Sequence, residues 1–186
     1  MKRIFDLLLV IISLSILSIP MILVAIAVRL TSKGSVLYWS NRVGKNNIVF
    51  RMPKFRSMLI ETPPIATHLL KNPKYYLSPI GGFLRRTSLD ELPQLFSVLN
   101  GNMSFVGPRP ALYNQDELIA LRTEKNIDKL LPGITGWAQV NGRDEILIND
   151  KVKLDLEYLI QQSFWLDIKI LWLTFLKVIR RDGVSH

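Results

Sequence analysis

An apolar segment near the start of the chain constrains the fold more than any other feature. Residues 7–28 carry no charged side chain. As a straight helix they would extend about 33 Å, enough to cross a bilayer core of roughly 30 Å. Basic residues flank the segment on both sides, with Lys2 and Arg3 before it and Arg29 and Lys33 after it. The segment therefore predicts contact with a membrane.

Three interpretations of this segment compete. A cleaved signal peptide fits the basic start, although Asp6 interrupts the apolar run and the run is long for such a peptide. A spanning helix fits the length, but the positive-inside rule expects an imbalance of basic residues between the two ends. A re-entrant helix fits the break at Pro20, which removes a backbone hydrogen bond, and Ser18, whose hydroxyl can satisfy a freed carbonyl. Residues 7–19 would reach only about 20 Å, so the pattern leaves the spanning and re-entrant helices open.

Residue counts exclude several classes of chemistry. The chain of 186 residues has the size of one domain and is 48% hydrophobic. It has no cysteine and only two histidines, His68 and His186. Disulfide scaffolds, thiol nucleophiles and cysteine-bound metals are therefore excluded, and a Ser-His-Asp triad nearly so. The net charge of +9 favours anionic partners, namely phosphates, nucleic acid or an anionic membrane face.

The polar remainder predicts an α-rich α+β fold. Short apolar runs at 36–39 and 48–50 flank turn-forming residues 44–47 and predict a small β-hairpin. Ser88 and Glu91 have the spacing of a capping box, which would begin a helix. Helices are expected at residues 88–99, 116–129, 149–162 and 164–181.

The last predicted helix is amphipathic. Its polar stripe consists of Asp167, Thr174, Lys177 and Arg181, and its other face is mostly apolar. Such a helix fits the bilayer interface, with basic residues toward the headgroups. It fits equally well against a protein core, and the pattern alone leaves both open.

The densest candidate site is the stretch from Arg85 to Glu91. Acidic residues in the first turn of a helix are favoured by the macrodipole and need no further function. The stretch also suits phosphoryl chemistry, because Asp90 or Glu91 can act as nucleophile or hold a divalent cation while Arg85 and Arg86 neutralise an anion.

Three further stretches allow both a structural and a functional interpretation. Arg109 stands between two prolines, either as a solvated residue in a rigid turn or as a fixed guanidinium for phosphate. Residues 132–143 are either a surface loop or a ligand loop with polar contacts from Asn141 and Arg143. Lys54 lies in a basic stretch that is either the solvated face of an edge strand or part of a binding site.

The order of these motifs is more specific than any one of them. Behind the apolar segment stand Lys-Phe-Arg-Ser-Met at 54–58, Ser-Leu-Asp-Glu-Leu-Pro-Gln-Leu at 88–95, Met-Ser-Phe-Val-Gly-Pro-Arg-Pro at 103–110 and Pro-Gly-Ile-Thr-Gly-Trp-Ala-Gln-Val-Asn-Gly-Arg at 132–143. This series closely resembles the small monotopic phosphoglycosyl transferases of the bacterial sugar transferase family. The resemblance covers nearly the whole chain, and the length resembles that of the family's minimal catalytic form.

The resemblance implies a topology. Residues 1–32 would form a re-entrant membrane helix kinked at Pro20, with both ends in the cytoplasm. Residues 33–186 would form one catalytic domain with interfacial amphipathic helices and the small hairpin. The protein would then lie on the cytoplasmic face of the bacterial inner membrane.

The resemblance also implies a reaction that initiates glycoconjugate assembly, such as that of an exopolysaccharide. A sugar 1-phosphate would pass from a UDP-sugar to a polyprenol phosphate, with Mg²⁺, release of UMP and a covalent aspartyl intermediate. Asp90 takes the place of the nucleophile and is also the expected metal ligand, and Glu91 completes the dyad. The basic residues expected to handle phosphates or the nucleotide are Lys54, Arg85, Arg109 and Arg143. Membrane lipids are expected partners, and nucleic acid is not.

Two rival hypotheses remain distinct from this one. A non-enzymatic, membrane-anchored module would use the positive charge to bind anionic lipid or nucleic acid, and UMP release from a UDP-sugar separates the two. A bitopic enzyme would place its catalytic part outside, which reagent access to the chain ends would reveal. The sequence predicts neither the sugar nor the oligomeric state.

Overall fold

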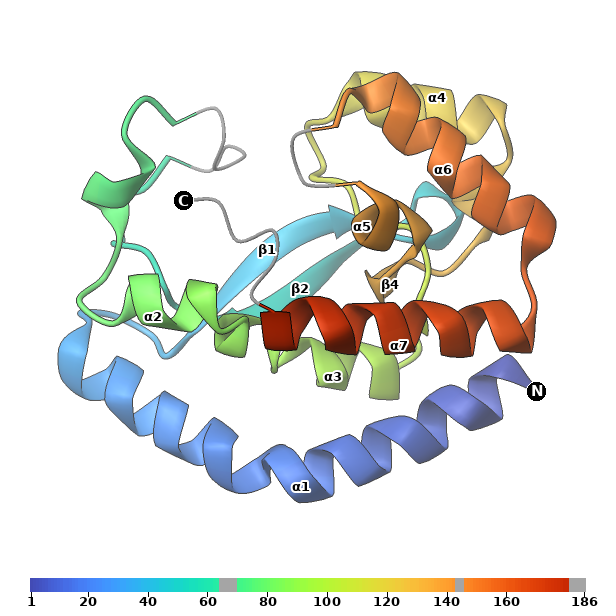
Figure 1. Ribbon diagram of the computed structural model, residues 1–186. Helices are drawn as coiled ribbons and strands as arrows, with labels where there is room; N and C mark the ends of the chain where they lie inside the picture. Colours follow the sequence, from blue (N-terminus) through green and yellow to red (C-terminus); the bar gives the residue numbers. More distant parts are fainter. Residues whose placement is uncertain (64–69, 143–145, 181–186) are drawn as a thin grey trace.

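The longest element of the protein is helix α1, Lys2–Thr31. The structure is a computed structural model that describes residues 1–63, 70–142 and 146–180. In it, α1 follows a curved path along one side of the molecule (Figure 1). The helix continues through Pro20 without ending there. The long apolar helix is thus confirmed, while the kink and the re-entrant course stay predictions.

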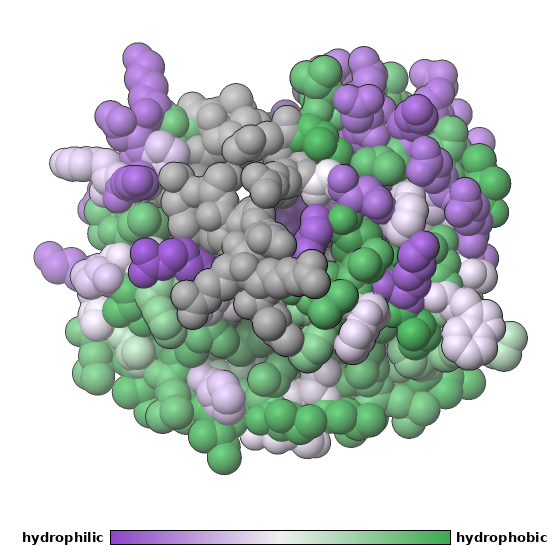
Figure 2. Space-filling model, in the orientation of Figure 1, coloured by the Kyte–Doolittle hydropathy of each residue, from purple (hydrophilic) through white to green (hydrophobic). Residues whose placement is uncertain are grey.

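Most of the surface of α1 is exposed and apolar. Figure 2 shows apolar side chains gathered on the lower face, where α1 lies. The exposed large residues run along the whole helix and comprise Ile4, Leu8, Ile11, Ile12, Ile16, Ile19, Ile22, Leu23, Ile26 and Leu30. The helix is long and apolar enough to cross a membrane. An apolar surface of this extent marks a site of contact with lipid or another protein.

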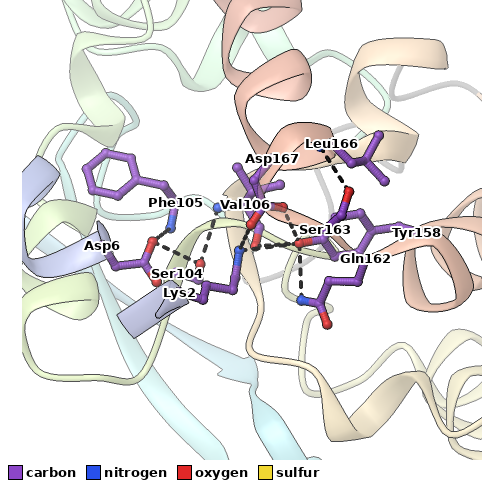
Figure 3. A network of polar contacts seen from close by, with 10 residues as sticks. All are labelled: Lys2, Asp6, Ser104, Phe105, Val106, Tyr158, Gln162, Ser163, Leu166 and Asp167. Atoms are coloured by element: carbon purple, nitrogen blue, oxygen red, sulfur yellow. Dashed lines mark hydrogen bonds and ion pairs between the residues drawn. The ribbon is translucent and has the colours of Figure 1, made fainter. Parts of the chain in front are cut away.

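The first turns of α1 are fixed to the rest of the protein by buried polar contacts (Figure 3). Asp6 is 1% exposed, and its Oδ1 accepts a hydrogen bond from the backbone N–H of Phe105 at 3.1 Å. Lys2 Nζ pairs with Asp167 Oδ2 at 2.5 Å, and Tyr158 donates its hydroxyl to the other oxygen of Asp167 at 2.7 Å. Buried charges are stable only when they are paired or hydrogen-bonded. These contacts therefore hold the first turns of α1 against Phe105, Tyr158 and Asp167.

The predicted hairpin is confirmed. Strands β1, Leu37–Val43, and β2, Val49–Phe55, pair antiparallel around a short 3-10 turn at Lys45–Asn47. Both strands are longer than the apolar runs that predicted them. In this register Tyr38 lies opposite Lys54, so β2 carries one of the candidate site residues.

A second, parallel pair of strands was not predicted. Strand β3, Ser104–Val106, pairs with β4, Gly133–Thr135. The pairing continues past β3, because Gly107 donates its N–H to the carbonyl of Thr135 at 2.9 Å. A side chain at Gly107 would collide with the backbone of residues 131–133. Two motifs far apart in the sequence therefore meet at one point.

Shorter α-helices complete the described part of the fold (Figure 1). They are α2, Gly81–Arg86; α3, Gln94–Leu99; α4, Asp116–Glu124; α5, Trp137–Asn141; α6, Ile148–Gln161; and α7, Phe164–Arg180. The predictions at 149–162 and 164–181 agree with α6 and α7. The prediction at 116–129 is wrong in its second half, because left-handed Asn126 ends the helical course and only a 3-10 turn follows.

The main core lies where α1, β2, α3, β3, α5, α6 and α7 meet. Its buried residues are Val10, Met52, Leu95, Val98, Met103, Phe105, Val106, Val140, Tyr158 and Ile170. A second cluster joins Val24 and Val28 of α1 to Phe55 and Leu84. Since α1 contributes to both clusters, it packs against the domain along its length while leaving its outer face exposed.

Helix α7 turns its polar stripe inward. Asp167 is buried, Thr174 Oγ1 lies 2.6 Å from Thr135 Oγ1, and Lys177 donates to the carbonyl of Gln139 at 3.2 Å. Its exposed large hydrophobic residues are Phe164, Trp165, Trp172, Phe175 and Val178, and Lys169 is exposed as well. The helix therefore packs on the core by its polar stripe, and Lys177 does not point outward as the interfacial interpretation expected. Arg181 lies outside the described residues.

Candidate active site

The acidic pair lies in a break between two helices. Helix α2 ends at Arg86, and Ser88 adopts a left-handed conformation with φ +56°. Asp90 and Glu91 follow in the 3-10 helix η4, Leu89–Glu91, and Pro93 precedes α3. A backbone N–H at the start of a helix has no carbonyl partner within that helix. Proline, which has no N–H, therefore costs no hydrogen bond at this place.

The predicted helix over 88–99 is therefore wrong in its first half, and so is the capping box. In the described structure Ser88 forms no side-chain capping bond. The Glu91 carboxylate points instead to two cations from other parts of the chain. Two charge-assisted contacts outweigh the single bond that a capping box would supply.

Glu91 joins three motifs. Its Oε1 accepts a hydrogen bond from Lys54 Nζ at 2.6 Å and one from an Arg109 guanidinium nitrogen at 3.2 Å. Burial alone would raise the pKa of Glu91, but the charges of Lys54 and Arg109 outweigh it and hold that pKa well below its usual range. Glu91 is therefore ionised at every physiological pH and acts as a fixed anion between two cations.

Asp90 is in the opposite situation. The residue is 7% exposed, and within the described part of the chain no side chain forms a hydrogen bond or ion pair with its carboxylate. Burial raises the pKa of Asp90 to about 6, and the charge of Glu91 adds to this shift. Lys54, Arg85 and Arg109 oppose it electrostatically. The Asp90 carboxylate is therefore mostly ionised at neutral pH. It has no side-chain partner among the described residues, and the charges of Lys54, Arg85 and Arg109 act on it.

Arg109 reaches the site from a rigid loop. The loop follows β3, and Pro108 and Pro110 fix the backbone on either side of it. The Pro108 carbonyl accepts the N–H of Gly133 at 2.9 Å, so the loop rests on β4. The Arg109 side chain is 38% exposed, so the residue lies at the surface of the site.

The remaining predicted residues divide into two groups. Arg85 lies in the last turn of α2, where its charge acts on Asp90 and its Nη1 lies 3.5 Å from Met58 Sδ. Asn141 does not reach the site, because its Nδ2 donates to the carbonyl of Trp137 in its own helix at 2.9 Å. Arg143 lies outside the described residues. The structure thus brings Asp90, Glu91, Lys54, Arg85 and Arg109 together, and their roles stay predictions.

Arg42 is a neighbour of the site that the sequence did not indicate. It lies in β1 and donates from Nη1 to the carbonyl of Pro110 at 3.2 Å. Burial, followed by the charge of Arg109, lowers the pKa of Arg42 to about 10. The contact depends on an isolated bridge between Arg42 and Leu112, which no local pattern in the sequence reveals.

The described residues do not form a protein cage for a metal, since they include no group of three or more His, Cys, Asp or Glu side chains that could hold one. Mg²⁺ is commonly bound by one or two carboxylates together with substrate phosphates and water. Asp90 fits this kind of site, because it offers an oxygen ligand with no competing side-chain partner. Glu91 is already held by Lys54 and Arg109.

The chain is similar to known transferases over its whole length. Residues 1–181 match the family model described as bacterial sugar transferase. The undecaprenyl-phosphate glucose phosphotransferase of Komagataeibacter xylinus is 42% identical over 96% of this chain and 36% of its own length. The UDP-glucose:undecaprenyl-phosphate glucose-1-phosphate transferase of Escherichia coli K12 is 40% identical over 95% of this chain and 40% of its own length. The uncharacterized sugar transferase EpsL of Bacillus subtilis is 39% identical over 100% of this chain and 91% of its own length. This chain therefore spans less than half of the first two relatives and nearly all of the third.

Proposed function

Because the chain belongs to the bacterial sugar transferase family, we propose that it transfers a sugar 1-phosphate from a UDP-sugar to a polyprenol phosphate such as undecaprenyl phosphate. The name of the Escherichia coli relative describes a UDP-sugar donor and this acceptor for that protein, and the name of the Komagataeibacter xylinus relative describes the same acceptor for that one. The observation that carries the proposal is the uncommitted, buried Asp90 carboxylate beside Glu91, which Lys54 and Arg109 hold in place.

The two substrates fix where such a reaction takes place. A polyprenol tail cannot leave the bilayer, and a UDP-sugar cannot enter it. The chemistry must occur at headgroup level. The exposed apolar surface of α1 supports this location, because it would immerse one side of the protein in lipid while the charged site stays in water.

We propose a reaction in two displacements at the β-phosphorus of the donor. An oxygen of the Asp90 carboxylate attacks this phosphorus, the bond to the oxygen that bridges the two phosphates breaks, and UMP leaves with that oxygen and its electron pair. A phosphate oxygen of the acceptor then attacks the same phosphorus and displaces the Asp90 carboxylate. The products are UMP and a polyprenol diphosphate sugar, and no atom is oxidised or reduced.

The basic residues lower the barrier to the first displacement. A carboxylate and a diphosphate repel each other, so positive charge is needed where they meet. Arg109 supplies a guanidinium fork on a partly exposed side chain, and Lys54 and Arg85 add positive charge near Asp90. Glu91 holds Lys54 and Arg109 at fixed positions. Arg143 is proposed as a further phosphate or nucleotide contact from the family resemblance alone.

We propose Mg²⁺ as the metal, with Asp90 and the donor phosphates as its ligands. When bound, Mg²⁺ would neutralise the diphosphate and stabilise the leaving UMP. Asp90 would hold the metal with its carboxylate, which is also the proposed nucleophile.

The proposed activity is tested by mixing the full chain with undecaprenyl phosphate, Mg²⁺ and one UDP-sugar at a time. The donors are UDP-glucose, UDP-galactose and UDP-N-acetylglucosamine, and the readout is released UMP. At least one donor should give UMP together with a radiolabelled lipid product. A protein that binds anionic vesicles but releases no UMP from any donor would be the non-enzymatic module instead.

We propose that α1 is re-entrant and that the protein lies on the cytoplasmic face of the inner membrane. Both ends of α1 are bound to the same domain, which supports this topology. At the first end, Lys2 pairs with Asp167 and Arg3 donates to two carbonyls at the end of α3. Beyond the other end, Arg56 donates to the backbone carbonyl and the hydroxyl of Ser35 at 2.8 and 2.7 Å. A helix that crossed the bilayer would have to separate these two ends by about 30 Å of hydrocarbon.

Labelling of single cysteines tests this topology, since the chain has no native cysteine. A cysteine added before Met1 and a Lys33→Cys variant should both resist a membrane-impermeant maleimide in intact spheroplasts and react after lysis. Pro20→Leu should straighten α1 and shift part of the population toward opposite labelling of the two ends. Opposite labelling in the native background would contradict the re-entrant topology.

The first displacement should depend on pH. Because burial raises the pKa of Asp90 to about 6, its nucleophilic form is lost as the pH falls below that value. The rate of UMP release from donor alone should fall about tenfold per pH unit on this side. Omitting the acceptor removes its own phosphate titration from the profile. If the rate of this first turnover stays constant down to pH 4.5 at the lowest Mg²⁺ concentration that supports it, Asp90 is not the titrating nucleophile.

A further inference from the structure

We infer that Arg122, held by Asp155, is a positioning residue that fixes the backbone of Arg109. The two residues lie in α4 and α6, outside the group of charges around Asp90. The inference rests on the proposed function, because it assigns Arg109 a task on the donor phosphates. It adds a buried ion pair to the machinery that the sequence motifs did not include.

The loop around Arg109 has few backbone N–H groups with which to form hydrogen bonds within itself. Pro108 and Pro110 have no backbone N–H, so the loop offers carbonyls and few donors. Each of its three carbonyls is instead held from outside. Gly133 N–H donates to the Pro108 carbonyl at 2.9 Å, and Arg122 Nη1 donates to the Arg109 carbonyl at 2.9 Å. The Pro110 carbonyl accepts from Arg42, as described above.

The geometry of Arg122 suits this task. Its Nε and Nη2 both donate to Asp155 Oδ2, at 3.0 and 2.6 Å, which leaves Nη1 for the Arg109 carbonyl. The planar guanidinium makes the three directions rigid relative to one another. Fixing one side of the group on Asp155 therefore fixes the donor on the other side.

The burial of the Arg122–Asp155 ion pair indicates that the pair does more than fill space in the core. The side chains of Arg122 and Asp155 are 9% and 2% exposed. Removing two charges from water is expensive, and apolar residues of similar volume often stabilise a protein as well or better. Simple core filling therefore does not explain the pair. The hydrogen bond to the loop does, because it links the pair to the residue that contacts Glu91.

The position of the Arg109 backbone matters for turnover because the guanidinium acts at a distance from it. A small rotation of the peptide would move the end of this long side chain by more than an ångström. Displacements of about 1 Å in catalytic geometry can lower rates by about 100-fold. Arg122 would thus act on the reaction only through Arg109.

A set of variants separates positioning from a structural role. Arg122→Met/Asp155→Leu removes the hydrogen bond without leaving a buried unpaired charge, so it should fold. Arg122→Lys keeps the charge next to Asp155 but loses the planar fork, and it serves where the double variant does not fold. Glu124→Gln/Lys125→Met is the matched control, since this surface pair lies at the end of α4, away from the loop.

The decisive comparison is made with and without Arg109. In the native background, the change at Arg122 should lower kcat/KM for the donor by about 10- to 100-fold. In an Arg109→Ala background, the same change should lower it less than about twofold, because the group it positions is gone. The control pair should leave both values unchanged.

Two results would overturn the inference. One is native turnover in the folded variants of Arg122. The other is an equal loss in both backgrounds, which is the pattern of a purely structural role. Failure of the proposed function would look different, because the unmodified chain itself would release no UMP from any donor.

Discussion

Asp90→Asn is expected to abolish turnover, with a loss of about four orders of magnitude or more. An amide is a poor nucleophile and offers no charge to a metal, so both proposed tasks of Asp90 disappear at once. The measurement is UMP release with a donor that the unmodified chain accepts. The same variant should form no covalent adduct with a radiolabelled UDP-sugar.

The loss should not reflect unfolding. No described side chain forms a hydrogen bond or ion pair with the Asp90 carboxylate, so the substitution breaks no such contact. Because the pKa of Asp90 is raised in the folded protein, its ionised form opposes folding at neutral pH. Asp90→Asn should therefore leave the free energy of unfolding unchanged or raise it, by up to about 3 kcal/mol.

Asp116→Asn is the matched control, since Asp116 is an exposed carboxylate in the first turn of α4. It should retain native activity. A folded Asp90→Asn protein with the native rate would contradict a nucleophilic role for Asp90. It would favour the explanation that the acidic pair only stabilises this turn.

Glu91→Gln is expected to lower turnover by about 100- to 1,000-fold. Glutamine keeps an oxygen that can accept a hydrogen bond but loses the charge that holds Lys54 and Arg109 together. The two cations would then repel each other and move from their positions around Asp90. The free energy of unfolding of this variant should also fall by about 1.5–3 kcal/mol, because hydrogen bonds to a charged group are lost.

The pH profile of this variant separates its effect from a general loss of structure. The charge of Glu91 raises the pKa of Asp90, and the charges of Lys54 and Arg109 lower it. Glu91→Gln should therefore shift the acid limb of UMP release, to lower pH where the cations keep their positions and to higher pH where they move away. Glu117→Gln, at an exposed position of α4, should change neither the rate of UMP release nor the pH at which this rate falls. An unshifted limb with a native rate would show that Glu91 has no influence on the nucleophile.

The sequence predicted the members of the site better than their arrangement. The motifs pointed to Asp90, Glu91, Lys54 and Arg109, and the fold brings these residues together. The capping-box spacing of Ser88 and Glu91 predicted a helix start, but Lys54 and Arg109 come from other parts of the chain and pair with Glu91 instead. A local pattern cannot anticipate partners that arrive through the tertiary fold.

The same limit explains what was missed elsewhere. Strands β3 and β4 have three residues each, too few for an alternating pattern to reveal. The spacing of Asp167, Thr174 and Lys177 showed that α7 is amphipathic, but not that its polar stripe faces inward. That orientation depends on Lys2, Thr135 and Gln139, which lie far away in the sequence.

The central claim is that the reaction passes through a covalent intermediate on Asp90. The most direct measurement is to mix the protein with radiolabelled UDP-sugar and Mg²⁺ in the absence of polyprenol phosphate. The account predicts a burst of about one UMP per protein molecule and a phospho-sugar on the peptide that contains Asp90. Adding undecaprenyl phosphate should then transfer the label to lipid. If UMP appears only when the acceptor is present, and the protein carries no label while the lipid product forms, the transfer is direct and the account is wrong.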